Sequence, residues 1–361
     1  GGSMSVLFVG YLHGFGGAEK MLITLSNAMA QSGLEVYLIS LSANNPVYEI
    51  SDGVTYLFLP DCVGNKILVI INRYKQLKKQ IKEVKPDLSI HFWLQSAYMC
   101  VFMNKEIVNR TIYAERGDPF DKEYSGFLGV MRKLSFQRIR GFVFQSKGAR
   151  DFFDESIRKK SLVIHNPVFI NSEDYPTPNE RDKRIVTVGR LHQQKNQKLF
   201  LEAISKLPED KRDYIVEIYG EGELREELQA EINKHSLTNR VFLKGAFKDV
   251  HKRIYAASLF VLTSDYEGMP NALLEAMALG MPCISTDCRP GGARELISSG
   301  VNGIIVPCGD VNILADKINE ILNSPNEANR LGEAAQNVLA HSNPEFIYSK
   351  WESFFLKMIE S

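Results

Sequence analysis

Short apolar runs alternate with amphipathic stretches in the first half of the chain, and this alternation is typical of a parallel sheet covered by helices. The first apolar run is followed by a glycine-rich turn and by a predicted helix over residues 19–31. The apolar runs that we predict as strands cover residues 6–10, 35–41, 55–59, 88–92, 110–114, 142–145 and 161–164.

The same rhythm starts again after a polar stretch at residues 171–184, which contains Pro176 and Pro178 and lacks apolar periodicity. This stretch is the predicted linker between two domains, residues 1–170 and 185–343. The predicted fold class is α/β, with two Rossmann-like doubly wound domains and a ligand site in the cleft between them. In the second half we predict helices over 196–206 and 224–235, and strands over 184–188, 214–219, 241–243, 259–263, 282–286 and 303–306.

Length and composition agree with a globular protein of two domains. The chain has 361 residues, of which 44% are hydrophobic and 24% are charged, and it has no run of 18 apolar residues. Its five cysteines are an odd number without a C-x-x-C pair, which argues against a disulfide framework or a zinc site. Gly1 to Ser3 ahead of Met4 read as a tag remnant, so we expect no targeting segment and a cytoplasmic location.

The net charge of zero hides an asymmetry, because residues 1–170 hold 21 Lys or Arg against 15 Asp or Glu and the remainder holds 22 against 28. Opposite charges could help two domains face each other, or the basic half could lie against anionic lipid. Residues 73–85 carry six cations beside an apolar stripe of Tyr74, Leu77, Ile81 and Val84. This stripe either packs into the first domain's core or lies on an anionic membrane, and we favour the membrane slightly.

The most informative segment covers residues 264–280, where Glu267 and Glu275 stand on either side of the start of a predicted helix. We predict that Asn271 is the N-cap of this helix. Free backbone N–H groups beside carboxylates suit a phosphate that carries a sugar. The alternative is an exposed acidic loop before an ordinary buried helix.

Two cations, Arg190 and Lys195, follow Gly189 at the carboxyl end of a predicted strand, where they could neutralise a diphosphate. No D-x-D pair occurs in the chain to hold a divalent metal, so we expect fixed cations to take this role and no metal cofactor. Loop cations are otherwise usually solvated.

Three glycine-rich turns also follow predicted strands. The first contains Gly16 and Gly17 and could approach a phosphate, but it lacks the third glycine and the acidic strand end of a dinucleotide site. A nicotinamide-dependent oxidoreductase is therefore disfavoured. Gly220 and Gly222 could pack against a base or ribose, Gly291 and Gly292 could add backbone donors, and all of these glycines could instead only form turns.

Charged residues also end a predicted strand in the first half. Glu115, Arg116 and Asp118 are a candidate site, although a surface salt bridge is nearly as good a reading. His91 and His165 end strands too, and we interpret both as structural.

Five segments, taken in order, resemble the retaining, nucleotide-sugar-dependent glycosyltransferases of family 4, which have the GT-B architecture of two facing Rossmann-like domains. These segments are GFGGAE, AERGDPF, VGRLHQQKN, YGEGE and SDYEGMPNALLEAMALGMPCIST. The second is similar to members that build bacterial surface glycans, although the family often has a His there. The resemblance also implies that residues 344–361 form a helix that packs back on the first domain.

The resemblance implies roles for particular residues. Glu267 would lie by the donor sugar, Glu275 would bind the ribose, and Arg190 and Lys195 would hold the diphosphate. The remaining donor contacts would come from Gly16, Gly17, Gly189, Gly220, Gly268, Met269, Pro270 and Asn271, and acceptor contacts from Glu115, Arg116 and Asp118.

The expected function is transfer of a sugar, with retention, from a nucleoside-diphosphate sugar to a glycan or lipid-linked acceptor in surface polysaccharide synthesis. A UDP-sugar is favoured, although the residues do not separate uridine from guanosine. An anionic membrane surface is an expected partner, and nucleic acid is not. The alternatives are a sugar phosphorylase or epimerase-like enzyme, for which no pyridoxal-phosphate lysine is identifiable, and a non-catalytic binder, which would be expected to lose Arg190, Lys195 or Glu267.

Overall fold

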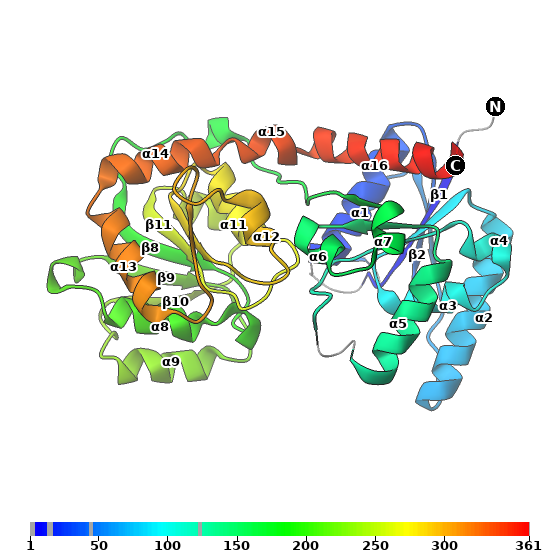
Figure 1. Cartoon of the computed structure of the whole chain (residues 1–361), viewed down its shortest axis with the longest axis horizontal. Helices are drawn as coiled ribbons and strands as arrows, with labels where there is room; N and C mark the ends of the chain where they lie inside the picture. Colours follow the sequence, from blue (N-terminus) through cyan, green and yellow to red (C-terminus); the bar gives the residue numbers. More distant parts are fainter. Residues whose placement is uncertain (1–3, 13–16, 43–45, 122–124, 361) are drawn as a thin grey trace. The chain divides into compact units, whose positions relative to one another are not determined.

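The computed structural model describes residues 4–12, 17–42, 46–121 and 125–360. The chain divides into two compact units (Figure 1). The N-terminal unit comprises Gly1–His165 and Ile347–Ser361, and the C-terminal unit comprises Asn166–Phe346. The division falls before the predicted linker, and the first strand of the C-terminal unit already begins at Asp182, inside the stretch predicted as linker.

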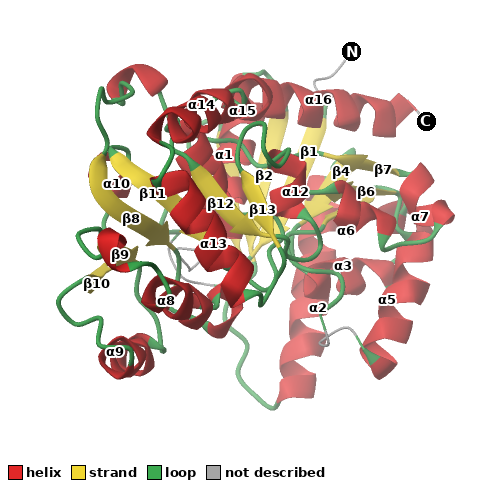
Figure 2. Cartoon of the chain, turned by 60° about the vertical axis from the view of Figure 1, so that its left-hand side comes forward, coloured by secondary structure: helices red, strands yellow, loops and turns green. Residues whose placement is uncertain are grey.

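The N-terminal unit contains a seven-stranded parallel sheet in the order β3-β2-β1-β4-β5-β6-β7 (Figure 2). Its inner strands β1, β4, β5 and β6 are buried, as the sequence predicts for a sheet that is covered on both faces, whereas the edge strands β3 and β7 are partly exposed. The strands are β1 (Ser5–Gly10), β2 (Glu35–Ser40), β3 (Val54–Phe58), β4 (Leu88–His91), β5 (Thr111–Ala114), β6 (Gly141–Phe144) and β7 (Ser161–Val163).

Helices cover both faces of this sheet. Leu7 and Val9 of β1 share a core cluster with the helix α2, whereas Phe8 between them contacts Phe355 of α16, with ring centroids 6.2 Å apart. Because successive strand residues point to opposite faces, α2 and α16 lie on opposite sides of the sheet. The helices are α1 (Gly17–Gln31), α2 (Lys66–Val84), α3 (Leu94–Val101), α4 (Lys105–Val108), α5 (Gly126–Arg138), α6 (Lys147–Asp151), α7 (Glu155–Lys159) and α16 (Pro344–Glu360).

The C-terminal unit contains a six-stranded parallel sheet in the order β10-β9-β8-β11-β12-β13. Ile185 and Val186 of β8 belong to different core clusters, so this sheet is also buried on both faces. The strands are β8 (Asp182–Val188), β9 (Ile215–Tyr219), β10 (Val241–Gly245), β11 (Ala257–Leu262), β12 (Cys283–Thr286) and β13 (Ile304–Val306). The helices are α8 (Gln197–Ser205), α9 (Arg225–Lys234), α10 (Val250–Ile254), α11 (Asn271–Ala278), α12 (Gly292–Leu296), α13 (Val311–Leu322), α14 (Pro325–Ala335) and α15 (Val338–Ser342).

The predicted strands and helices begin and end within two residues of those observed, and the fold class is confirmed. Among the described residues, no helix is both long enough and apolar enough to cross a bilayer.

The predicted membrane stripe of α2 is wrong. Leu77 and Ile81 are buried in the core with strand residues, and the hydroxyl of Tyr74 donates to the carbonyl oxygen of Phe102 at 3.2 Å. Arg73 is buried as well, and it donates to the carbonyl oxygens of Leu59 and Pro60. The stripe therefore holds the helix on its own sheet, and a membrane cannot contact it.

Candidate functional site

Four neighbouring strands of the C-terminal unit send loops to one edge of its sheet. These strands are β9, β8, β11 and β12. The chain adds β9 and β10 on one side of β8 and then adds β11 to β13 on its other side, so the order of strand addition reverses between β8 and β11. Loops diverge at such a reversal, which is where open α/β sheets bind ligands. The loops at this edge are residues 189–196, 220–223, 263–270 and 287–291.

Lys195 and Glu267 form an ion pair across this reversal. Lys195 Nζ donates to Glu267 Oε1, and the exposed fractions of the two side chains are 20% and 8%. Ser264 Oγ donates to the same carboxylate oxygen at 2.7 Å, and Gln194 Nε2 donates to Oε2 at 3.4 Å. The sequence places both charges at strand ends, and the structure brings them together, with Glu267 buried and Lys195 partly buried.

Arg190 lies at the solvent side of the same loop, with 68% of its side chain exposed. Its guanidinium is 3.3 Å from Glu223 Oε2, and His192 Nε2 is 3.4 Å from the other oxygen of that carboxylate. An exposed pair of this kind is weak, so an anionic ligand can displace Glu223 at little cost.

Two glycines allow the 220–223 loop to cross the loop that carries Arg190. A Cβ on Gly220 would lie 2.0 Å from the carbonyl oxygen of Gly189, and a Cβ on Gly222 would lie 2.3 Å from that of Leu191. Gly220 also has a φ of +138°, which favours glycine. These glycines therefore pack the two loops together rather than only forming a turn.

The predicted N-cap of α11 is wrong. Asn271 is the first residue of the helix, and Pro270 occupies the cap position without a side-chain hydrogen bond. The side-chain oxygen of Asn271 instead accepts a hydrogen bond from Asn166 Nδ2 at 2.7 Å. This tertiary contact from a distant segment outweighs the local preference for capping.

Glu275 lies on α11 with a partner that the sequence does not predict. His251 Nε2 from α10 is 3.0 Å from Glu275 Oε2, and both side chains are partly exposed. The two residues are 24 positions apart and share no motif, so only the fold identifies the pair. Glu275 therefore retains accessible carboxylate surface for a further hydrogen-bond donor.

Of the other predicted glycine positions, Gly292 is structural and Gly16 lies outside the described residues. A Cβ on Gly292 would lie 2.4 Å from the carbonyl oxygen of Gly268, so the start of α12 packs against the 268–271 backbone. Arg294 forms a two-point ion pair with Asp287 at 2.8 and 2.7 Å, which holds α12 in place. Gly17 is the first residue of α1.

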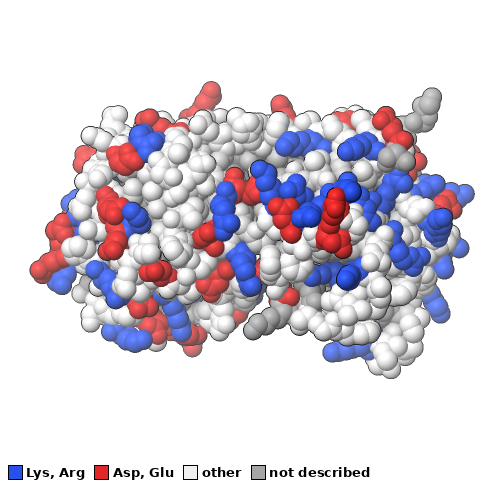
Figure 3. All heavy atoms as spheres, in the orientation of Figure 1, with Lys and Arg blue, Asp and Glu red and all other residues white. Residues whose placement is uncertain are grey.

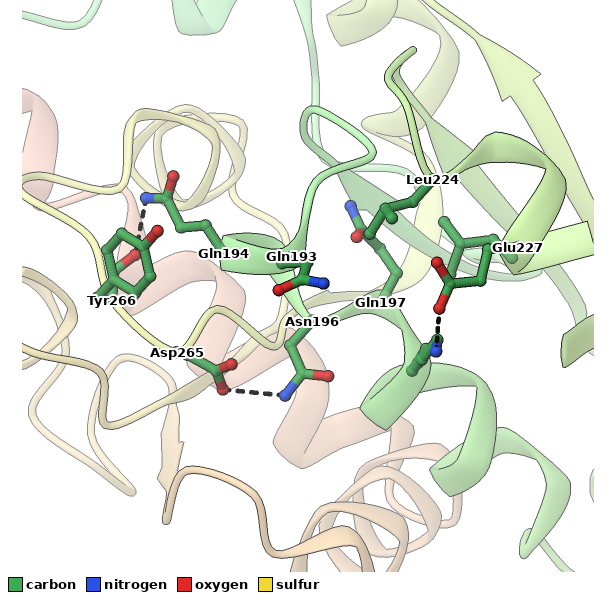
Figure 4. Close-up of a pocket in the computed structure, with 10 residues that line it drawn as sticks. Gln193, Gln194, Asn196, Gln197, Leu224, Glu227, Asp265 and Tyr266 are labelled. Carbon is green, nitrogen blue, oxygen red and sulfur yellow. Dashed lines mark hydrogen bonds and ion pairs between the residues drawn. The ribbon is translucent and has the colours of Figure 1, made fainter.

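A polar pocket of about 310 Å³ is lined by residues of the 189–196 and 263–270 loops (Figure 4). Gln194 connects this pocket to the Lys195–Glu267 ion pair, because its Nε2 donates to Glu267 Oε2 at 3.4 Å as well as to the carbonyl oxygen of Tyr266 at 2.8 Å. Asn196 donates to Asp265 at 2.9 Å on the same wall. The amides and carboxylates of this pocket suit hydroxyl groups. Its lining comprises Gln193, Gln194, Asn196, Gln197, Lys198, Leu224, Glu227, Leu228, Asp265 and Tyr266.

In the N-terminal unit, the loop after β5 is held by its own charged residues. Glu115 is buried, and its Oε1 accepts hydrogen bonds from the backbone N–H groups of Arg116 at 3.1 Å and Gly117 at 3.0 Å. Burial raises the pKa of Glu115, and these hydrogen bonds oppose that rise. Asp118 is also buried and accepts from the backbone N–H of Phe120 at 3.0 Å.

Arg116 packs against aromatic rings. Its guanidinium carbon lies 4.2 Å from the ring centroid of Phe92 and 5.6 Å from that of Trp351 on α16. Burial lowers the pKa of Arg116 to about 9, so it stays a cation at neutral pH. Backbone hydrogen bonds and ring contacts therefore hold the shape of this loop beside the carboxyl ends of β4 and β5.

His91 is structural, as interpreted from the sequence. It is fully buried, with hydrogen-bond partners at Ser89 (3.2 Å), Ser96 (2.9 Å) and Cys100 (3.4 Å). Burial lowers the pKa of His91 to about 3, so the ring is neutral.

Comparison with known proteins identifies the family to which this chain is similar. The model of glycosyl transferases group 1 matches residues 171–338, and that of glycosyltransferase family 4 matches residues 15–171. A Campylobacter jejuni GalNAc-alpha-(1->4)-GalNAc-alpha-(1->3)-diNAcBac-PP-undecaprenol alpha-1,4-N-acetyl-D-galactosaminyltransferase is 26% identical over 328 residues, 90% of each chain. The lipopolysaccharide 1,6-galactosyltransferase of Salmonella typhimurium is 34% identical over 166 residues, which are 44% of this chain and 45% of that enzyme.

Two solved structures share the fold over almost the whole chain. Anabaena HepE in complex with UDP has a TM-score of 0.80 at 17% identity and covers 98% of this chain and 100% of its own. The lipopolysaccharide outer core galactosyltransferase WaaB has a TM-score of 0.79 at 19% identity and covers 98% and 99%. Since the two family models together match residues 15–338, the chain belongs to the family 4 glycosyltransferases and has the GT-B fold of two Rossmann-like domains.

Proposed function

We propose that the protein transfers a sugar, with retention of configuration, from a UDP-sugar to a lipid-linked glycan acceptor in the synthesis of a bacterial surface polysaccharide. The observation that carries this proposal is the Lys195–Glu267 ion pair at the strand reversal of the C-terminal unit. A cation and a carboxylate held together there can receive a diphosphate and a sugar hydroxyl side by side.

In this proposal the leaving diphosphate is neutralised by Arg190 and Lys195. Bond breakage leaves negative charge on the diphosphate, and one well-placed donor contributes ~3 kcal/mol to stabilising such a charge. Lys195 would shift its hydrogen bond from Glu267 to a phosphate oxygen, while Glu267 accepts a hydroxyl hydrogen bond from the sugar. The two fixed cations make a metal cofactor unnecessary.

The remaining contacts to the donor come from α11 and the loop before it. Glu275 accepts hydrogen bonds from the ribose hydroxyls, and the backbone at residues 268–271 meets the sugar and phosphate. Retention requires either a covalent carboxylate intermediate or attack on the same face, and the proposal covers both routes.

The acceptor is assigned to the N-terminal unit, at the loop of Glu115, Arg116 and Asp118. The name of the Campylobacter jejuni relative specifies an acceptor linked through diphosphate to undecaprenol, and the name of the Salmonella relative specifies lipopolysaccharide. These names support a lipid-linked glycan acceptor and a peripheral membrane location for this chain. The UDP in the HepE crystals supports a uridine nucleotide.

A thermal-shift screen followed by a transfer assay tests the proposal. Ligand at 100 times its Kd adds about 2.7 kcal/mol of stability, so UDP should raise the melting temperature more than GDP. Transfer should then be read by NMR as a product with the anomeric configuration of the donor. A product with the opposite configuration, or stabilisation by GDP alone, would overturn the corresponding part of the proposal.

A further inference from the structure

The first two turns of α2 are apolar around their whole circumference and yet exposed. Ile67 has 69% of its surface exposed, and Leu68, Ile70 and Ile71 are exposed as well. Their positions, 100° apart per residue, cover all sides of the helix, and none of the residues 66–72 is buried. A helix that is apolar on every side is normally buried, so this segment lacks a covering partner among the described residues.

The helix α5 has a second exposed apolar surface. Phe127 is 77% exposed, and Leu128, Val130 and Leu134 are exposed too. Residues 127, 130 and 134 recur at spacings of three and four, so they form one stripe, opposite the buried Arg132 and Phe136. The N-terminal ends of α2 and α5 both project beyond the sheet on the same side of the unit (Figures 1 and 2). We call the exposed apolar residues of these two helix ends the apolar tip.

Positive charge follows the apolar tip along both helices. Of the nine Lys or Arg residues in the two helices, Arg73 and Arg132 are buried and Lys66 precedes the apolar residues, so six cations follow the apolar tip against a single acid, Glu83. On α2, Lys75, Lys78, Lys79 and Lys82 lie about 6–17 Å along the axis from Ile71, at a rise of about 1.5 Å per residue. In Figure 3 the lower end of this unit is largely white, with blue side chains around and above it.

We propose that the apolar tip inserts into an anionic membrane and that these lysines contact the lipid headgroups. Interfacial helices bury their apolar residues about 5–10 Å into the bilayer, so the lysines of α2 would lie at headgroup level when Ile67 to Ile71 are inserted. A groove on a protein partner would need one apolar face on α2, whereas the bilayer accepts all sides of the helix. The cations select an anionic surface.

This inference rests on the proposed function, because the apolar tip would hold the protein at the surface where a lipid-linked acceptor is presented. Crossover helices of a parallel sheet begin at the edge where the preceding strands end. The N-terminal ends of α2 and α5 therefore share a sheet edge with the Glu115–Asp118 loop, which itself lies between β5 and α5. Docking by the apolar tip would place this loop beside the membrane surface.

The test is sedimentation with vesicles of phosphatidylglycerol and phosphatidylcholine in equal parts, without any donor sugar. The variant Ile67→Ser/Ile70→Ser/Phe127→Ser should bind at least about tenfold more weakly than the wild type, because three apolar side chains no longer leave water. The matched control is Phe102→Ser/Phe242→Ser/Val301→Ser, which changes three exposed apolar residues elsewhere and should bind like the wild type.

Equal binding by wild type and apolar-tip variant would overturn the inference. It would also be overturned if the wild type formed dimers that the apolar-tip variant converts to monomers while neither binds vesicles, since the tip would then be covered by a second copy. Both variants should unfold at the wild-type temperature because the changed residues are exposed. Transfer to a detergent-solubilised acceptor without vesicle binding would overturn docking alone, and vesicle binding without transfer would overturn the proposed function alone.

Discussion

The loops at the strand ends of the two units use their charged residues in different ways. In the C-terminal unit, Lys195 and Glu267 come from different strands and meet across the reversal of the sheet. In the N-terminal unit, Glu115 binds the backbone of its own loop and Arg116 packs on aromatic rings. The C-terminal unit pairs opposite charges from two strand ends, whereas the N-terminal unit uses its charges to fix the shape of one loop.

This difference explains where recognisable motifs occur. A diphosphate and a ribose are the same in every donor of one nucleotide, so their site needs fixed charges at fixed spacings. The proposed acceptor site would instead depend on the shape of the loop and on its surroundings, such as α16 and the apolar tip. Variants that disturb only one unit should therefore separate the effect of loop shape from the effect of charge.

Trp351→Ala should destabilise the N-terminal unit most. Trp351 is fully buried between Phe92, Phe355 and Arg116, and removal of a buried Trp side chain costs about 3–5 kcal/mol. Chemical unfolding should show this loss. Leu356→Ala on the same helix is exposed and should change the free energy of unfolding by less than about 0.5 kcal/mol. Similar losses in both variants would show that α16 does not position the loop through Trp351.

Gly220→Ala should break the loop crossing in the C-terminal unit. The new Cβ collides with the carbonyl oxygen of Gly189, and the left-handed φ adds strain, so we expect a loss of about 3 kcal/mol. Gly309→Ala is the control, because its φ is +73° but no atom lies within 4 Å of the added Cβ. It should lose only about 1–2 kcal/mol. If the two variants unfold alike, backbone strain alone accounts for the effect and the crossing is not tight.

Arg190→Ala or Lys195→Ala should reduce donor turnover by at least about a hundredfold, or about 2.7 kcal/mol in activation free energy, while the fold survives. Lys234→Ala is the control, since it changes an exposed lysine on α9 that pairs with Glu231. Initial rates with UDP-sugar at saturation are the measurement. Near-normal rates in both test variants would remove the diphosphate assignment.

Excess chelator should leave turnover unchanged, because fixed cations are proposed to neutralise the diphosphate and the sequence has no D-x-D pair. Rates measured with EDTA and with added magnesium or manganese provide the comparison. An absolute requirement for either metal would mean that charge at the donor site is not supplied by Arg190 and Lys195 alone.

The sequence predicts elements well where local pattern decides, and it fails where distant contacts decide. Strands such as β8 and β9 are found from their apolar runs, and Lys195 and Glu267 from their position at strand ends. The capping role of Asn271 fails because Asn166, 105 residues earlier, binds its side chain. The pairing of His251 with Glu275 has no local signal at all.

The helix α2 is a further case in which contacts within the fold, and not the sequence pattern, decide which apolar residues are buried. Its apolar stripe at Leu77 and Ile81 fits a membrane surface and a protein core equally well in sequence, and packing against β1 and β2 decides for the core. The apolar residues Ile67 to Ile71 look like ordinary core residues in the sequence. Only the fold shows that this end of the helix projects beyond the sheet and stays exposed.

The central claim is that the C-terminal unit binds the nucleoside diphosphate through charges that are already assembled. Isothermal titration of UDP into the wild type, Lys195→Ala and Lys234→Ala measures whether Lys195 binds the diphosphate. UDP should bind the wild type and Lys234→Ala with the same Kd and should bind Lys195→Ala at least about tenfold more weakly, since a hydrogen bond to a charged group contributes about 1.5–3 kcal/mol. Equal affinity for UDP in all three proteins would show that Lys195 does not bind the diphosphate.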